Sequence, residues 1–241
     1  MYQGKKVSVV FPVYNEEKNI RKAIEEFFAT GLVDEIVAVD NNSKDGSSTE
    51  IKASKATYVF ETRQGYGAAL QRGMREATGD LIVTVEPDGT FSARDLEKLL
   101  IYSLDFPVVI GTRTARSLVG AGANMGWLLR MGNIVVAKLL GCLFRGTTLT
   151  DVGCTFKLIH RDALLKIQDK FTVAGSHFSP EFMIRVLSAG IPMVEIPVHY
   201  GERIGESKIT GKLDKAAKLG FRMIRFIIQE WFVWKTKKTQ S

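Results

Sequence analysis

Cysteine is scarce in this 241-residue chain, which contains only Cys142 and Cys154. The two residues lack the Cys-x-x-Cys spacing of a metal site, and two are too few for the disulfide framework of a small secreted protein. We therefore expect both to be buried thiols in a protein of a reducing compartment.

Long apolar runs are also missing. The longest apolar stretches, 125–144 and 219–234, are interrupted by Arg130 and Lys138 in the first and by Arg222, Arg225 and Glu230 in the second. Neither reaches the roughly 20 uninterrupted apolar residues that span a bilayer. The N-terminal residues lack the apolar core of a signal peptide. The sequence thus predicts a protein made in the cytosol that could lie on a membrane surface.

Internal repeats, low-complexity segments and flexible linkers are absent, which predicts one α/β domain, residues 1–212, followed by a helix and basic tail, 213–241. Hydrophobic residues make up 45% of the chain and charged residues 24%, as in ordinary globular proteins. The net charge of +7 indicates an anionic partner. Composition alone leaves open whether that partner is nucleic acid, a phospholipid headgroup or a phosphorylated small molecule.

Short apolar runs alternate with helical patterns in the first 111 residues. Strands are expected at 7–11, 35–39, 57–60, 81–85 and 108–110, and helices at 16–30, 47–54, 67–78 and 95–104. This alternation predicts a doubly wound, mainly parallel sheet with helices on both faces. Farther along, helices are expected at 122–144 and 180–188, strands at 156–159 and 193–196, and a final helix after residue 212.

Ligands of such sheets bind beyond the carboxyl ends of the strands. The segments that follow the first four strands are polar: Pro12 to Glu16, Asp40 to Gly46, Arg63 to Gly67 and Glu86 to Thr90. A dinucleotide site would need Gly-x-Gly-x-x-Gly after the first strand, where this chain has Pro-Val-Tyr-Asn-Glu instead. The glycines at 65 and 67 follow the third strand without the last glycine of that motif, and no Walker lysine motif is present.

Glu86 and Asp88 are two residues apart where the fourth strand ends, so an extended backbone points both carboxylates the same way. Two such oxygen ligands suit Mg²⁺ or Mn²⁺ shared with a substrate diphosphate. The alternative is that Pro-Asp-Gly simply forms a turn. Asp40 could similarly accept hydrogen bonds from a nucleobase or ribose. The alternative is that the segment is an ordinary Asx turn, formed by Asn42, Ser43 and Asp45, that caps the helix at 47.

Taken together, these segments resemble family 2 glycosyltransferases. The resemblance rests on Val-Val-Phe-Pro-Val-Tyr-Asn-Glu, Asp-Asn-Asn-Ser-Lys-Asp-Gly, Gly-Tyr-Gly-Ala-Ala-Leu, the run from Gly79 to Gly89, and Gly111-Thr-Arg113. Downstream, Asp151-Val-Gly-Cys-Thr-Phe-Lys, Glu195-Ile-Pro-Val and Arg203-Ile-Gly-Glu-Ser-Lys208 resemble the dolichol-phosphate mannosyltransferase branch. The similarity covers about residues 6 to 210 and implies a GT-A-type fold.

The resemblance also implies a role for each matching residue. Nucleotide binding is expected of Pro12, Tyr14, Glu16, Asp40 and Arg63, metal binding of Glu86 and Asp88, and acceptor-phosphate binding of Arg113 and Arg130. Catalysis is expected of Asp88, Arg113, Arg203 and Lys208, the last two acting on the diphosphate. The first metal position holds Glu86 instead of the aspartate of the family motif, so Glu86 could reach the cation through water or could leave Asp88 as the main ligand.

The chemistry of the acceptor discriminates between two kinds of reaction. A hydroxyl acceptor needs a general base, for which Glu181 is the candidate, although that residue could instead serve the dipole of its helix. A lipid phosphate needs no base, because its second pKa is about 6 and it is already anionic at neutral pH. Arginine side chains could bind such a phosphate bidentately.

The last helix places cations opposite aromatic and aliphatic residues. Lys215, Lys218, Arg222, Arg225 and Gln229 recur every three or four residues, and Trp231, Trp234, Lys235, Lys237 and Lys238 follow. This pattern suits a helix in the headgroup plane of a membrane, or alternatively a helix that closes the domain or forms a dimer. It disfavours nucleic acid as the partner, because a base-stacking groove is not apparent.

These observations predict a metal-dependent inverting hexosyltransferase that uses Mg²⁺ or Mn²⁺. It would move a hexose from a GDP- or UDP-sugar to a polyprenyl or dolichyl phosphate, as a peripheral protein on the cytosolic face of a membrane. Two alternatives remain open. One is a soluble family 2 transferase acting on a glycan or small molecule, and the other is a catalytically silent nucleotide-sugar-binding domain.

Overall fold

The computed structural model describes residues 1–120, 122–123, 126–144, 148–203 and 213–239. Within them, seven strands form one sheet in the order β3-β2-β1-β4-β6-β5-β7. The strands are β1 (Val7–Val13), β2 (Glu35–Asp40), β3 (Thr57–Phe60), β4 (Leu81–Thr84), β5 (Val108–Thr112), β6 (Lys157–His160) and β7 (Met193–Pro197). All neighbouring pairs are parallel except those of β6, which runs antiparallel between β4 and β5. The doubly wound, mainly parallel fold is thus confirmed.

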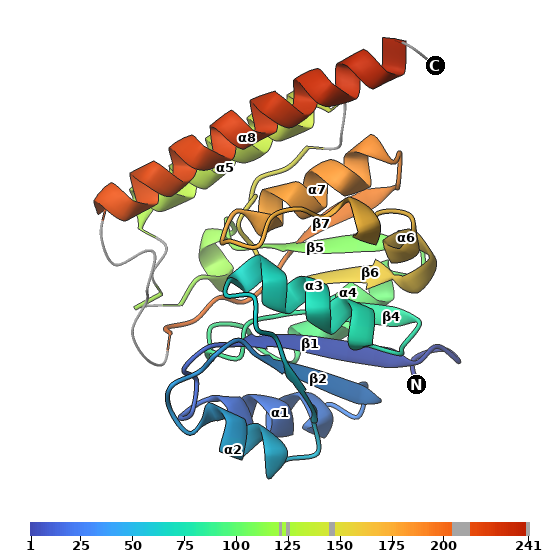
Figure 1. The fold of residues 1–241 in the computed structure, drawn as a ribbon, viewed down its shortest axis with the longest axis vertical. Helices are drawn as coiled ribbons and strands as arrows, with labels where there is room; N and C mark the ends of the chain where they lie inside the picture. The colour runs from blue at the N-terminus through green and yellow to red at the C-terminus, as the bar shows by residue number, and fades with distance from the viewer. Residues whose placement is uncertain (121, 124–125, 145–147, 204–212, 240–241) are drawn as a thin grey trace.

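Helices cover both faces of this sheet (Figure 1). They are α1 (Ile20–Ala29), α2 (Ser47–Lys52), α3 (Tyr66–Glu76), α4 (Asp95–Tyr102), α5 (Trp127–Leu143), α6 (Arg161–Leu165), α7 (Phe178–Ser188) and α8 (Leu213–Thr239). Short 3₁₀ turns lie at Arg116–Leu118 and Gln168–Lys170. The expected helices all form, whereas the short α6 and the 3₁₀ turns escape prediction because their hydrophobic patterns are shorter than two helical turns.

Successive side chains of β1 point to opposite faces of the sheet and belong to two separate hydrophobic cores. Val7, Val9, Phe11 and Val13 pack with α1, α2 and α4 on one face, while Val10 packs with α3, α5, α6, α7 and α8 on the other. Both faces are therefore buried, which explains why the strand is an almost continuous apolar run.

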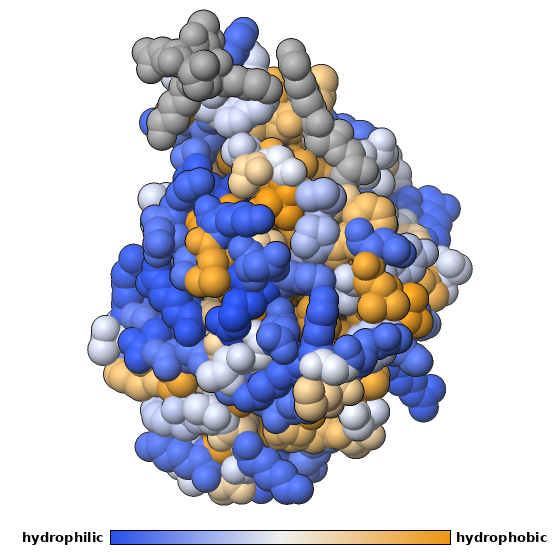
Figure 2. Space-filling model, turned by 90° about the vertical axis from the view of Figure 1, so that its right-hand side faces the viewer, coloured by the Kyte–Doolittle hydropathy of each residue, from blue (hydrophilic) through white to orange (hydrophobic). Residues whose placement is uncertain are grey.

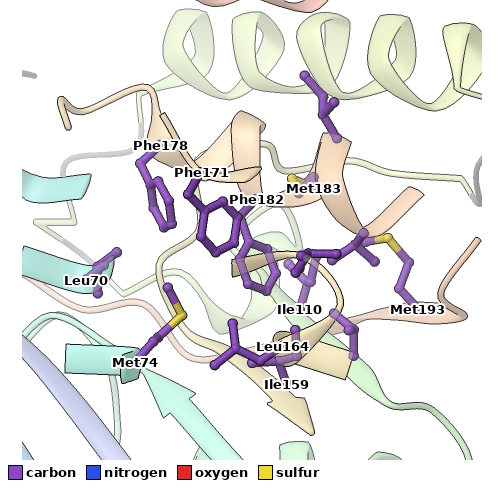
Figure 3. Close-up of a cluster of buried hydrophobic side chains, with 14 of the residues drawn as sticks. Leu70, Met74, Ile110, Ile159, Leu164, Phe171, Phe178, Phe182, Met183 and Met193 are labelled. Carbon is purple, nitrogen blue, oxygen red and sulfur yellow. The ribbon is translucent and has the colours of Figure 1, made fainter. Parts of the chain in front are cut away.

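Aromatic and sulfur-containing side chains fill the second core (Figure 3). The ring centroid of Phe171 lies 5.0 Å from that of Phe178 and 6.1 Å from that of Phe182. These rings hold α7 against the sheet, beside Met183 and Met193. Cys154 is buried as expected, but the expectation for Cys142 is wrong, because this residue lies on the exposed side of α5.

The two long helices α5 and α8 lie side by side and run in the same direction across the outside of the α7 layer (Figure 1). Phe144 directly follows α5 and Trp234 lies in the last third of α8. Their ring centroids are 5.4 Å apart. Met223 and Ile227 of α8 are buried in the second core, so α8 is packed into the domain. None of the described helices combines the length and apolarity needed to cross a bilayer.

The parallel strands share one carboxyl edge. In Figure 1, β1 begins near the N label on the right, so this edge lies on the left. Figure 2 shows the opposite edge, which is mostly hydrophilic, with orange patches separated by blue. The fold thus gathers the polar segments after β1, β2 and β4 at the left-hand edge, where sequence analysis expects the site.

Candidate active site

The loops after β1 and β2 are bonded to each other at the carboxyl edge. The backbone N–H of Asn15 donates to Ser43 Oγ at 3.1 Å, the N–H of Lys44 donates to Asn15 Oδ1 at 2.7 Å, and the N–H of Glu16 donates to Ser47 Oγ at 2.8 Å. Asn15 has a φ of 56°, a left-handed conformation that asparagine tolerates better than most residues. These contacts fix the segment that carries Tyr14 and Glu16.

Asp40 ends β2 with a carboxylate that is 2% exposed. It accepts hydrogen bonds from the Ser43 N–H at 3.0 Å and from the hydroxyl groups of Ser48 and Tyr58. Burial by itself would raise the pKa of Asp40, but these hydrogen bonds outweigh burial and lower the pKa. Asp40 is therefore an ionised acceptor opposite Val13 of β1, and Pro12, one residue earlier in that strand, is buried. The Asx turn of the alternative interpretation forms at Asp45, whose Oδ1 accepts the Ser47 N–H at 3.0 Å at the start of α2.

Asn41, for which sequence analysis predicts no individual role, organises the segment that carries Arg63. Its Nδ2 donates to the carbonyl oxygens of Glu61 and Arg63 at 3.0 and 2.9 Å, and its Oδ1 accepts the Gly65 N–H at 2.7 Å. The side chain of Arg63 is left exposed at this edge. A buried amide that binds a loop 20 residues away has no local sequence signal.

Glu86 and Asp88 follow β4, just before and within a bend over residues 87–89, and the charge of Asp88 acts on the Glu86 carboxyl. Asp88 is 1% exposed, and its Oδ1 accepts the N–H and the hydroxyl of Thr90 at 3.0 and 2.6 Å. Burial, together with the charge of Asp88, raises the pKa of Glu86 to about 7. Two crowded carboxylates of this kind form a site that favours a cation.

Arg203 supplies a positive charge to this cluster. Its Nη1 lies 3.0 Å from Asp88 Oδ2 and its Nη2 lies 2.7 Å from Glu16 Oε1. One guanidinium thus links the loop after β1 to the loop after β4. Glu16 also accepts a hydrogen bond from Asn19 Nδ2 at 2.8 Å. The structure therefore brings together Glu16, Glu86, Asp88 and Arg203, whereas Lys208 lies outside the described residues.

A divalent ion fits this donor set only if a substrate completes it. Among the described residues, no three Asp, Glu, His or Cys side chains are placed to hold a metal. Glu86 and Asp88 supply the hard oxygen atoms that Mg²⁺ and Mn²⁺ prefer, and Mg²⁺ is commonly held by one or two carboxylates plus substrate phosphates. The two carboxylates are thus suited to a cation shared with a diphosphate.

Arg113, at the end of β5, forms a buried bidentate ion pair. Its Nε and Nη2 lie 2.8 Å from the two oxygens of Asp151, and its backbone N–H donates to the same carboxylate at 3.0 Å. The guanidinium also lies 5.1 Å from the ring centroid of Tyr200. Burial of Asp151 would raise its pKa, but the ion pair outweighs burial and lowers it. Two of the three guanidinium nitrogens are thus engaged by the protein.

Asn133, in the first half of α5, reaches the same region as Arg113. A Cβ on Gly153 would lie 2.9 Å from Arg113 Nη2 and 3.3 Å from Asn133 Oδ1, so these side chains share the space that this glycine leaves. The Nε atom of Arg130 is buried and has no hydrogen-bond partner among the described residues. Asn133 has no individual signal in the sequence, because it lies within an otherwise apolar helix.

Glu181, the candidate base for a hydroxyl acceptor, lies in the interior at 0% exposure. Its carboxylate accepts the N–H and hydroxyl of Thr172, the N–H of Val173 and an Arg185 nitrogen, all at 2.8–2.9 Å. The interpretation of Glu181 as a base is therefore wrong. This carboxylate instead holds the 172–173 segment to α7.

Comparison with known proteins identifies the class. The sequence model described as glycosyl transferase family 2 matches residues 8–168. A glycosyltransferase of unassigned activity from Mycobacterium tuberculosis is 32% identical over 211 residues, covering 87% of this chain and 92% of its own. A dolichyl-phosphate hexose transferase of Haloferax volcanii is 29% identical over 228 residues, covering 93% and 95%.

Solved structures share the fold. The glucosyl-3-phosphoglycerate synthase of Mycobacterium tuberculosis, in complex with Mn²⁺, UDP-glucose and phosphoglyceric acid, is similar with a TM-score of 0.72 at 21% identity. The match covers 95% of this chain and 80% of that one. The same synthase with Mg²⁺ and UDP has a TM-score of 0.70.

The mainly parallel sheet thus has the GT-A type of fold that these synthase structures share. More specifically, the chain belongs to glycosyl transferase family 2, as the match over residues 8–168 shows.

Proposed function

We propose that this glycosyltransferase moves a hexose from a nucleotide sugar to a polyprenyl or dolichyl phosphate at a membrane surface, with inversion and with Mg²⁺ or Mn²⁺. The observation that carries the proposal is the cluster of Glu16, Glu86, Asp88 and Arg203 at the carboxyl edge. Acidic groups and a guanidinium lie there within one hydrogen-bond network, as a metal-bound diphosphate requires.

The donor would bind along the edge from β2 to β4. Asp40, Pro12 and Tyr14 are proposed to contact the base and ribose, and Arg63 is proposed to act from the exposed rim. The UDP complexes of the similar synthase support a nucleotide donor here, and its complexes with Mn²⁺ or Mg²⁺ support the cation. The cation, held by Glu86 and Asp88, would neutralise charge that develops on the departing diphosphate.

The acceptor phosphate would bind on the α5 side. Arg113 is already oriented by Asp151, and Arg130 has a buried Nε that lacks a partner among the described residues. A guanidinium held in this way loses little freedom when it binds a phosphate. A phosphate acceptor also needs no base, which agrees with the engagement of Glu181 in structural hydrogen bonds.

The lipid character of the acceptor is supported by α5 and α8. Trp127, Met131 and Val135 lie on one side of α5 and are 67%, 37% and 58% exposed. Phe221 and Phe232 of α8 are 71% and 57% exposed. Exposed apolar residues at helical spacing suit helices that lie in the headgroup region of a bilayer.

Cations accompany the exposed apolar side chains of α8. Lys218, Arg222 and Arg225 line a shallow depression together with Phe221. Each cation near an anionic surface contributes about 1 kcal/mol of attraction. The similarity to the dolichyl-phosphate hexose transferase of Haloferax volcanii supports the same acceptor class. The 1–212 domain would then act at the surface to which 213–239 attaches it.

The test is nucleotide release from a panel of GDP- and UDP-sugars with Mn²⁺, with and without a short polyprenyl phosphate in detergent. Release that requires the lipid phosphate, with formation of glycosyl-lipid, is the expected result and would also identify the donor. Asp88→Asn should lower the rate about 100-fold or more, because it removes charge from the metal site. Asp105→Asn, at an exposed position after α4, is the matched control.

Three outcomes would contradict the proposal or part of it. Turnover with a soluble sugar or phosphorylated small molecule, but none with lipid phosphate, would assign a soluble acceptor. Nucleotide-sugar binding without release under any acceptor would assign a catalytically silent binding domain. An Asp88→Asn variant with unchanged turnover would exclude the metal role of this carboxylate.

A further inference from the structure

The guanidinium of Arg203 is bound to two carboxylates that come from different strands. Nη2 lies 2.7 Å from Glu16 Oε1, after β1, and Nη1 lies 3.0 Å from Asp88 Oδ2, after β4. We infer that Arg203 is an internal counter-cation, which occupies the metal-binding oxygen of Asp88 until metal and donor bind together. This inference rests on the proposed function and adds the order in which its ligands can bind.

The two oxygens of Asp88 are not equivalent. Oδ1 accepts two hydrogen bonds from Thr90, which fix the rotamer of the carboxylate and occupy that side. Oδ2 faces Arg203. A divalent cation that binds Asp88 without disturbing Thr90 must therefore use Oδ2, the oxygen that Arg203 contacts.

Arg203 and the metal cannot share this oxygen without cost. A metal about 2.1 Å from Oδ2 would lie within about 5 Å of the guanidinium, so two cations would face each other beside a buried group. A metal that arrives alone must displace Arg203 from Asp88. The free protein should therefore bind divalent cations weakly, although its carboxylates are already in place.

The donor diphosphate removes this conflict. Its oxygens complete the coordination of the metal, and a released guanidinium can bind the same diphosphate through its planar array of donors. Arg203 would then exchange two protein carboxylates for a substrate anion. Metal and nucleotide should thus increase each other's affinity, and by linkage the factor is the same in both directions.

The decisive experiment measures Mn²⁺ affinity of the full chain by calorimetry or by the electron paramagnetic resonance of free Mn²⁺. Wild type and Arg203→Gln are titrated without nucleotide, with UDP and with GDP. Without nucleotide, Arg203→Gln should bind Mn²⁺ about tenfold more tightly than wild type, within the usual range of coupling between sites. With the preferred nucleotide, the gain in Mn²⁺ affinity should be large in wild type and small in the variant.

Arg72→Gln is the matched control, because it removes one positive charge from a partly exposed ion pair on α3. Its Mn²⁺ affinity should equal that of wild type. Arg203→Lys keeps the charge but can reach only one carboxylate at a time, so its affinity without nucleotide should fall between the other two. If Arg203→Gln unfolds, this lysine variant provides the same comparison.

The results separate the inference from the proposed function. Equal or weaker Mn²⁺ binding by the Arg203 variants, together with nucleotide-dependent Mn²⁺ binding by wild type, would overturn the counter-cation role and leave the metal site intact. Failure of wild type to bind Mn²⁺ with either nucleotide would overturn the metal site, and the inference with it.

Discussion

Lys157 carries an ammonium group into the interior of the sheet. The side chain is 5% exposed, its Nζ donates to Ser179 Oγ at 2.7 Å, and it also contacts the carbonyl oxygen of Cys154. Burial penalises the charged form and lowers the pKa of Lys157 from 10.5 to about 8. The charge is tolerated because polar groups surround the nitrogen, but the native state binds this proton less tightly than the unfolded chain does.

This shift predicts how stability depends on pH. Below about 8 both states are protonated and the native state bears the full cost of the buried charge, whereas above 10.5 neither state is protonated. Between these values the unfolded state binds more protons, so the free energy of unfolding rises with pH. In urea unfolding, the stability of wild type relative to Lys157→Met should therefore increase across this window.

The control for this prediction is Lys166→Met, which removes an exposed ammonium group at the end of α6. This variant shows how removal of an exposed ammonium group alone affects stability over the same pH range, and the Lys157→Met difference is compared with it. A Lys157→Met difference that changes with pH no more than that of the control would mean that the buried nitrogen has an ordinary pKa.

Individual side chains show which parts of the site a sequence can predict. The closeness of Glu86 and Asp88 follows from their two-residue spacing, and their charges interact, but the backbone bends at 87–89 where an extended segment was expected. The pairing of Arg113 with Asp151 joins residues 38 positions apart and has no local signal. The position of Arg113 is therefore predictable from a motif, but its engagement by Asp151 is not.

The helix α8 contains neighbouring isoleucines in opposite environments. Ile227 is 0% exposed and belongs to the core between α8 and the sheet, whereas Ile228 is 39% exposed. Ile227→Ala should lower the free energy of unfolding by about 2–5 kcal/mol, because it leaves a cavity in a packed core. Ile228→Ala should change it by about 0.5 kcal/mol or less. Chemical denaturation of both variants tests the contrast.

This pair tests whether residues 213–239 are a separable appendage. The expected loss in Ile227→Ala would show that α8 stabilises the domain that precedes it. Equal and small effects of both substitutions would indicate that α8 can detach without lowering the free energy of unfolding of the domain.

Elements differ in how far the sequence specifies them. The strands β1, β2, β4 and β5 are predictable because burial on both faces makes each of them a short apolar run between polar loops, whereas the edge strand β3 is recognised by its β-branched and aromatic residues. The position of β6 between β4 and β5, and its reversed direction, depend on pairings with strands more than 40 residues away. Local periodicity contains no information on such an order.

At the level of the whole molecule, α5 and α8 are expected to set the orientation on a membrane. Phe221→Glu combined with Phe232→Glu should reduce binding to vesicles that contain anionic lipid by about tenfold or more, because burying each phenylalanine contributes roughly 1.5–3 kcal/mol. Sedimentation with vesicles measures this loss. The two positions are exposed, so the folded domain should retain its thermal stability.

Phe60→Glu provides the control for vesicle binding. This residue is 46% exposed on the edge strand β3, which belongs to another part of the molecule. It should leave vesicle binding unchanged. If the double variant of α8 also binds vesicles as wild type does, the exposed aromatic side chains serve another partner and the membrane part of the proposed function is wrong.

The reversed strand β6 has a consequence for how this protein folds during its synthesis on the ribosome. β4 and β5 are synthesised well before β6, which pairs with both of them. Until residue 160 has left the exit tunnel, β4 and β5 each have an edge that lacks its final partner strand. Unpaired strand edges can form hydrogen bonds with other chains, which leads to aggregation. Translation speed through residues 113–156 therefore sets how long the nascent chain is exposed to aggregation, and chaperones should be needed most during this interval.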